Sequence, residues 1–122
     1  MSIVIKGATV VSTYGQRQVD VRIVDEKIAA VGVDIATPAD TIVDARGCYL
    51  LPGFIDAHTH MELNNGPGTA STADNFTTGT IAAVAKGTTA VIDMATPDRG
   101  HSLQECLATW NNLAAGKSSS DY

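Results

Sequence analysis

The stretch that decides the fold is PGFIDAHTH, residues 52–60. It joins a Pro-Gly pair, a short apolar run and an Asp-x-His-x-His pattern. The chain has only three histidines, and two of them, His58 and His60, lie here one residue apart. In an extended strand, residues i and i+2 point to the same side, so the two imidazoles aim at one point. Histidine nitrogens at this spacing can reach one zinc ion, whereas on a helix they would have to be at i and i+4.

An H-x-H pattern alone is weak evidence, because paired polar residues on a sheet face or a turn have the same spacing. The full run is more specific. It is an apolar strand that follows a Pro-Gly pair, ends in Asp-x-His-x-His and is followed by a loop rich in Gly, Asn and Thr, Glu62–Thr72. Asp56 lies on the same strand face as the histidines and could bind an ion, orient a ligand or hold the loop. Asp93 ends the next apolar run. We expect it near His58 and His60, because the catalytic residues of a parallel α/β barrel lie at the C-terminal ends of its strands.

The residues before this motif predict a small β module. Val19, Val21 and Ile23 alternate with polar residues, which is the period of a half-buried strand. Short apolar runs at 3–5 and 9–11 predict two further short strands. Turn residues recur about every ten positions, so we expect a meander of hairpins.

The residues after the motif predict two strand–helix units. Ser71–Asp74 resembles a capping sequence before a helix over Asn75–Lys86, with Gly87 as its C-terminal glycine. Ser102 and Glu105 form a capping box before a second helix. The apolar residues of this helix recur on one face, predicted to lie toward the core: Leu103, Cys106, Leu107, Trp110, Leu113 and Ala114.

The predicted fold class is therefore α/β, with two parts. Residues 1–52 form the β module, and residues 53–122 form the first two strand–helix units of a parallel barrel. The run at 88–94 is apolar and β-branched, as expected of a buried parallel strand. Such strands need neighbours on both sides, so we expect an incomplete barrel that stops before its third strand.

Composition limits the function classes. The chain has 122 residues, a net charge of −5 and 44% hydrophobic residues, as expected of one globular domain. Its eight Lys and Arg are scattered, which argues against nucleic acid as a partner. No apolar run approaches the ~20 residues that cross a bilayer, and the first residues lack the layout of a secretion signal. We therefore expect a cytoplasmic protein without membrane contact, with Cys48 and Cys106 as reduced, buried thiols.

The run from Pro52 to His60 resembles the signature of the amidohydrolase superfamily, P-G-h-h-D-x-H-x-H on the first strand of a TIM barrel. The segments IKGATVV, DVRIVDEKIAAVG and TADNFTTGTIAAVAKGTTAVIDMATP resemble the cyclic-amide hydrolases, of the dihydropyrimidinase and D-hydantoinase type. The resemblance covers essentially the whole chain as the N-terminal portion of such a protein. It implies that residues 1–52 are part of a β sandwich and that residues 53–122 begin a metal-dependent (β/α) barrel.

The resemblance also implies a site with two metal ions, commonly zinc, although another divalent metal is possible. His58 and His60 would bind the more buried ion, and Asp56 and Asp93 would orient the site. A carboxylated lysine, two further histidines and a catalytic aspartate belong to later strands in the family, so no catalytic residue is assigned in this chain. The substrate-facing loop would include three residues: Leu63, Asn64 and Asn65.

The resemblance predicts the N-terminal part of a hydrolase that opens the ring C–N bond of a cyclic amide or imide, of the hydantoin or dihydropyrimidine type. Alone, the chain is expected to be inactive, because two histidines form only half of the site. We expect it to associate with further copies or with a complementary chain, because strand edges without neighbours invite pairing. Two alternatives stay open: a non-catalytic assembly protein derived from the family, and a dihydroorotase-like hydrolase. Retention of both histidines argues against the first alternative.

Overall fold

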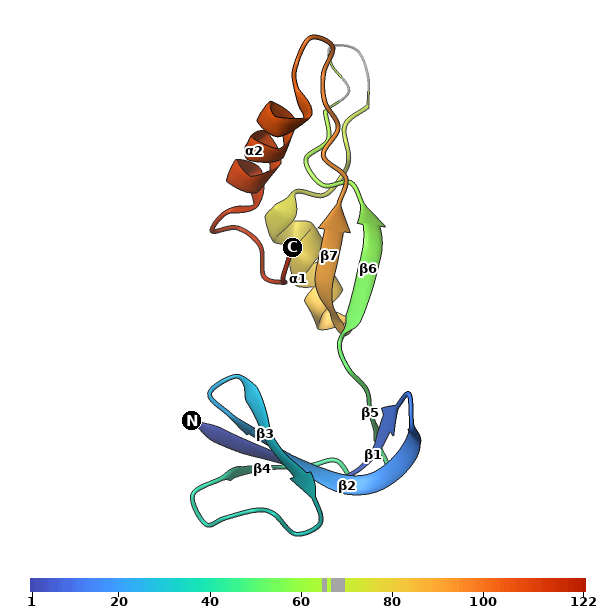
Figure 1. The fold of residues 1–122 in the computed structure, drawn as a ribbon, viewed down its shortest axis with the longest axis vertical. Helices are drawn as coiled ribbons and strands as arrows, with labels where there is room; N and C mark the ends of the chain where they lie inside the picture. The colour runs from blue at the N-terminus through green and yellow to red at the C-terminus, as the bar shows by residue number, and fades with distance from the viewer. Residues whose placement is uncertain (65, 67–69) are drawn as a thin grey trace. The chain divides into compact units, whose positions relative to one another are not determined.

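The structure is a computed structural model that describes residues 1–64, 66 and 70–122 (Figure 1). The chain divides into two compact units, Met1–Pro52 and Gly53–Tyr122. In the described ranges, no helix is long and apolar enough to cross a membrane.

The first unit is one five-stranded sheet with the order β3-β2-β1-β4, in which β5 also pairs with β1. Its strands are β1 (Ser2–Ser12), β2 (Gly15–Val24), β3 (Lys27–Gly32), β4 (Thr41–Asp44) and β5 (Tyr49–Leu50). The first three strands form the antiparallel meander expected from the sequence. That this sheet is part of a sandwich stays a prediction.

The last two strands of this unit correct the prediction of a meander of hairpins. β4 and β5 run parallel to β1, with Ile3 opposite Thr41 and Thr9 opposite Tyr49. After β3 the chain crosses to the other edge of β1 instead of turning back beside β3. Hydrophobic alternation defines the buried face of a strand but does not choose its neighbour, so the sequence pattern could not detect this crossing.

A bulge joins the two short strands predicted at 3–5 and 9–11 into the single strand β1. The register against β2 shifts between Ile5 and Ala8, and Gly7 lies there with φ +76°. The buried carboxylate of Asp20 accepts the Gly7 N–H at 2.8 Å and the Asp34 N–H at 3.1 Å. Asp20 therefore satisfies the backbone at the bulge and fixes the start of the crossing segment.

The second unit has a two-stranded parallel sheet, β6 (Phe54–Thr59) and β7 (Thr88–Asp93), with helices α1 (Phe76–Ala85) and α2 (Leu103–Ala114). Near the C-terminus, Asp121 forms a parallel bridge with Ala90 of β7. The core of the unit draws one buried residue from each of four segments: Met61, Phe76, Val91 and Ala114. The α/β class and the two strand–helix units predicted from the sequence are confirmed.

The helix ends agree with the sequence in part. The capping box of Ser102 and Glu105 at α2 is confirmed, with the Ser102 N–H donating to Glu105 at 2.8 Å. Gly87 follows α1 with φ +90°, as expected of a C-terminal glycine. The prediction that Ser71–Asp74 caps α1 was wrong. The N-cap is Asn75, because its carboxamide accepts the Thr78 N–H at 2.9 Å and the Thr78 hydroxyl accepts the Asn75 N–H.

The apolar face of α2 is only partly buried, which corrects the expectation that all of it lies toward the core. Cys106 and Ala114 are buried, but Leu103 is 76% and Leu107 is 56% exposed. The prediction of a buried thiol is confirmed for Cys106 and wrong for Cys48, which is exposed in the first unit. Strand β7 is likewise only partly buried, with Val91 covered and Ile92 exposed. Periodicity identifies the apolar face of an element, whereas the neighbouring elements decide how much of that face is covered.

Candidate metal centre

The two histidines of the motif converge at the end of β6. The Nε2 atoms of His58 and His60 lie 3.1 Å apart, and the ring centroids are separated by 5.1 Å. Zinc–nitrogen bonds of about 2.05 Å at a tetrahedral angle place two ligating nitrogens about 3.3 Å apart. Both rings are on exposed residues, so an ion can approach them from solvent. The pair therefore fits two coordination positions of one divalent metal.

The local backbone explains this convergence. His58 belongs to β6 and His60 follows its last residue, so the two side chains leave an extended backbone on the same side. The Asp56 carboxylate accepts the His58 N–H at 3.2 Å. Asp56 thus contacts the backbone of the first histidine, and its carboxylate lies next to the pair.

Asp93 at the end of β7 contacts the segment that carries the histidines. Its Oδ2 atom accepts the Thr59 hydroxyl and the Met61 N–H, each at 2.8 Å. Its Oδ1 atom accepts the indole N–H of Trp110 at 2.7 Å. The carboxylate is half-buried and both oxygens are engaged. Asp93 is therefore tied to the residues on either side of His60 and to helix α2.

The donor set in this chain is incomplete for a closed metal site. Residues 1–64, 66 and 70–122 contain no group of three or more His, Cys, Asp or Glu placed to hold an ion together. Structural zinc takes four ligands and catalytic zinc usually takes three from the protein. Two convergent imidazoles are consistent with one part of such a site.

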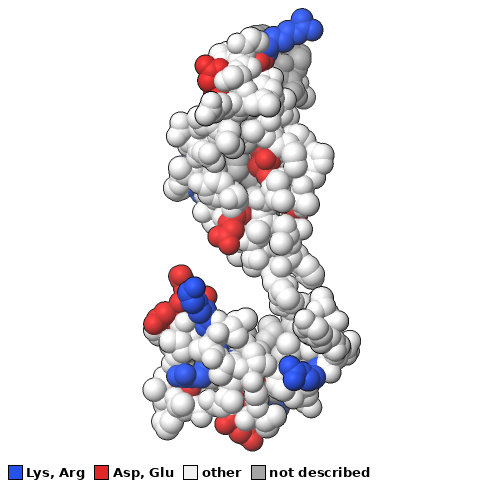
Figure 2. Space-filling model, viewed as in Figure 1, with Lys and Arg blue, Asp and Glu red and all other residues white. Residues whose placement is uncertain are grey.

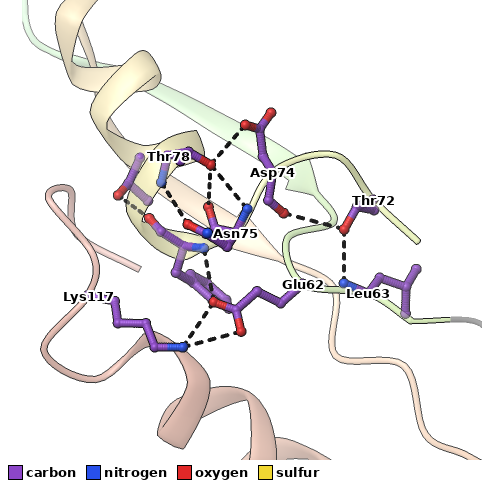
Figure 3. A network of polar contacts seen from close by, with 9 residues as sticks. Glu62, Leu63, Thr72, Asp74, Asn75, Thr78 and Lys117 are labelled. Atoms are coloured by element: carbon purple, nitrogen blue, oxygen red, sulfur yellow. Dashed lines mark hydrogen bonds and ion pairs between the residues drawn. The ribbon is translucent and has the colours of Figure 1, made fainter.

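The loop that follows the histidines is closed at its base by a polar network (Figure 3). The Leu63 N–H donates to the Thr72 hydroxyl and the Thr72 N–H donates to the Leu63 carbonyl, both at 3.0 Å. Asn64 and Ser71 form an antiparallel bridge one step farther along. Leu63 and Asn64, two of the residues predicted to face a substrate, therefore lie at the base of the loop. The third, Asn65, lies outside the described residues.

Glu62 extends this network to two other segments, as Figure 3 shows. Its carboxylate accepts the N–H of Phe76 in the first turn of α1 and pairs with Lys117 after α2. Glu62, Trp110 and Lys117 were not among the predicted site residues, and Trp110 was predicted only as part of the apolar face of the second helix. A tryptophan on a half-buried helix face needs a hydrogen-bond acceptor for its indole N–H. This requirement could have indicated from the sequence that Trp110 contacts a polar group.

The model of the Amidohydrolase family matches residues 49–116. This chain belongs to the amidohydrolase family. The whole chain is 44% identical to the D-hydantoinase of Rhizobium radiobacter, of which it covers 26%. Over 98% of its length it is 42% identical to the dihydropyrimidinase of Rattus norvegicus, of which it covers 24%.

A solved structure supports the fold of this amidohydrolase chain. The crystal structure of dihydropyrimidinase from Brevibacillus agri NCHU1002 matches all of the chain with a TM-score of 0.92 and 43% identity. The match covers 26% of that protein. The chain therefore spans about a quarter of the length of these relatives, and the resemblance to their N-terminal portion is confirmed.

Proposed function

We propose that the chain is the N-terminal part of a metal-dependent hydrolase that opens the ring C–N bond of cyclic amides of the hydantoin or dihydropyrimidine type. The observation that carries the proposal is the 3.1 Å separation of the His58 and His60 Nε2 atoms at the end of β6. The relatives named hydantoinase and dihydropyrimidinase support the substrate class.

In this proposal His58 and His60 hold one ion through Nε2, and zinc is the first candidate because neutral imidazole nitrogens suit it. A divalent cation held there supplies the positive charge that polarises an amide carbonyl and makes water a better nucleophile. Asp56 and Asp93 orient the segment that carries both rings, through the hydrogen bonds at 2.8–3.2 Å. In this proposal Leu63 and Asn64, at the closed base of the loop after the histidines, face the substrate.

We propose that the chain alone does not turn over substrate. Two histidines leave most of the coordination positions to other donors, because the described residues hold no group of three or more metal-ligating side chains. We also assign no residue of this chain to protonate the leaving nitrogen. The complementary strands would come from a longer form of the protein or from a second chain.

Exposed apolar side chains on the parallel sheet support such a partner. Phe54 and Ile55 of β6 and Ile92 of β7 are each more than half exposed. Among the described residues, β6 pairs on one edge only, with β7. Light scattering should therefore detect self-association, and a monomer at high concentration would contradict this proposal.

The surface charges give no support for a nucleic-acid partner. Figure 2 shows one face, on which charged side chains of both signs are scattered between uncharged surface, with no continuous basic patch.

The test combines metal analysis with hydrolysis. Zinc binding by the chain should be lost in His58→Ala and retained in His101→Ala, because His101 is the third histidine and is exposed beside Glu105. Hydantoin, dihydrouracil and dihydroorotate are then offered to the chain alone and to the chain mixed with a polypeptide of the remaining barrel. Hydrolysis of the first two substrates only by the mixture supports the proposal. Unchanged zinc content in His58→Ala would refute the role of His58 as a metal ligand. Turnover by the chain alone would refute the proposal that the chain is inactive by itself.

A further inference from the structure

The only tryptophan of the chain and the segment that carries the histidines donate hydrogen bonds to the same carboxylate. Trp110, on α2, donates its indole N–H to Asp93 Oδ1 at 2.7 Å. The other oxygen of Asp93 accepts from Thr59 and from Met61. The carboxylate therefore joins helix α2 to the end of β6, with all three donors within 2.8 Å.

His60 lies between the two donors that share Asp93 Oδ2. The Thr59 hydroxyl precedes it and the Met61 N–H follows it, so the carboxylate fixes the backbone on both sides of the ring. The Met94 N–H also donates to the Thr59 carbonyl, at 2.9 Å. The ring of His60 can approach His58 only while this backbone keeps its place.

The orientation of Asp93 in turn depends on Trp110. A carboxylate rotates about its last torsion unless both oxygens are held. The Thr59 and Met61 donors hold Oδ2, and the indole N–H holds Oδ1. Trp110 packs against the buried cluster of the unit, which fixes the position of its N–H.

We propose that Trp110 is a positioning residue for the metal site and that it acts through Asp93 on the backbone at His60. The metal part of this inference rests on the proposed function, whereas the link from Trp110 to His60 does not. Groups hydrogen-bonded directly to a metal ligand commonly change metal affinity by about 10-fold to 100-fold. Trp110 is farther out than such a group, because it reaches His60 only through Asp93 and the neighbouring residues Thr59 and Met61. We therefore expect an effect of about threefold to tenfold.

The first variant is Trp110→Phe, which keeps an aromatic ring and removes the N–H. Zinc is titrated into the full chain while the ring ¹⁵N signals of His58 and His60 are followed by NMR. The variant should bind zinc about threefold to tenfold more weakly than the wild type. Thr109→Val on the same helix is the matched control, because among the described residues the Thr109 hydroxyl donates a hydrogen bond only to the Glu105 carbonyl. It should bind zinc as the wild type does.

A double-mutant cycle separates positioning from general loss of stability. If Trp110 acts through Asp93, Trp110→Phe combined with Asp93→Asn should bind zinc within about twofold of Asp93→Asn alone. Independent, additive losses would overturn the inference. Circular dichroism confirms that each variant is folded.

A metal-free measurement keeps the inference testable if the metal role fails. Hydrogen exchange at the Met61 amide should be about fivefold faster in Trp110→Phe, because its acceptor is no longer held, and unchanged in Thr109→Val. Equal protection of Met61 in both variants would refute the positioning role. Absence of any zinc effect on the histidine rings of the wild type would instead refute the metal site and leave the exchange result to decide the role of Trp110.

Discussion

The ammonium of Lys117 lies 3.1 Å from Oε1 and 3.3 Å from Oε2 of Glu62, although the two residues are 55 positions apart. Glu62 Oε1 also accepts the Phe76 N–H, at 3.3 Å. Glu62 therefore ties together the loop after β6, the first turn of α1 and the segment after α2. The Glu62 side chain is only 19% exposed and that of Lys117 is 44% exposed, so the pair is partly shielded from solvent.

Replacement of the two partners should have unequal effects on stability. Lys117→Met removes only the half-exposed ion pair and should lower the free energy of unfolding by about 0.5 kcal/mol. Glu62→Ala also removes the acceptor at the start of α1 and should cost about 1–2 kcal/mol. Urea unfolding followed by Trp110 fluorescence measures both, and Glu62→Gln should lie between them. Equal losses in Lys117→Met and Glu62→Ala would contradict the role of Glu62 at the helix.

Gly53 of the Pro-Gly pair is required by a close approach to β7. A Cβ atom at Gly53 would lie 2.0 Å from the Thr89 hydroxyl and 2.8 Å from the Thr89 Cβ. Rotation of the Thr89 side chain cannot relieve the second contact, so Gly53→Ala should force β6 and β7 apart and cost about 1–3 kcal/mol. Thr89→Gly in the same chain should restore much of the loss. Ala at position 53 with wild-type stability would show that the strands adjust freely.

The stability of the first unit should fall in acid because of Asp40. Hydrogen bonds from the Ser2 side chain and the Thr37 N–H hold the pKa of Asp40 well below its usual range, with Arg22 adding to the effect. A carboxylate with a lowered pKa in the folded state stabilises that state above the unfolded pKa, near 4, and the contribution is lost as the pH falls further.

The corresponding test compares urea midpoints of the first unit from pH 5 to pH 2, followed by the amide signal of Thr37. The wild-type midpoint should fall over this range, and that of Asp40→Asn should be lower at pH 5 and fall less. Arg46 lowers the pKa of Asp44 to about 2, but the Asp44 side chain is more than half exposed. Asp44→Asn should therefore change the pH profile less than Asp40→Asn.

The capping box of α2 should stabilise the folded state through the hydrogen bond that Ser102 accepts. Ser102→Ala removes the acceptor of the Glu105 N–H and should lower the free energy of unfolding by about 1 kcal/mol. Ser102→Asp keeps an acceptor at the same place and should remain close to the wild type. Trp110 lies on the same helix, so its fluorescence during urea unfolding reports the change. An alanine variant as stable as the aspartate variant would exclude a role for the cap.

The elements of the second unit were predictable because each follows from a local pattern. The capping box at Ser102 and the glycine after α1 are set by residues close together in the chain. The cap of α1 was misplaced, because Asn75 and Thr78 form an equivalent box that the Ser/Thr-x-x-Glu pattern does not include. The parallel pairing of β4 with β1 was missed, because it depends on a crossing segment held by Asp20, a residue distant in the sequence.

The sequence by itself determined the alternation that sends His58 and His60 to one side of a strand, because strand geometry repeats every two residues. It also determined the family, through a motif that lies within nine consecutive residues. Only the tertiary structure decided what holds the histidines in place. Asp93 reaches Thr59 and Met61 because β6 and β7 pair in parallel, and Trp110 reaches Asp93 because α2 and β7 contribute side chains to the same buried cluster. These contacts join residues 17 to 34 positions apart, and no local spacing encodes them.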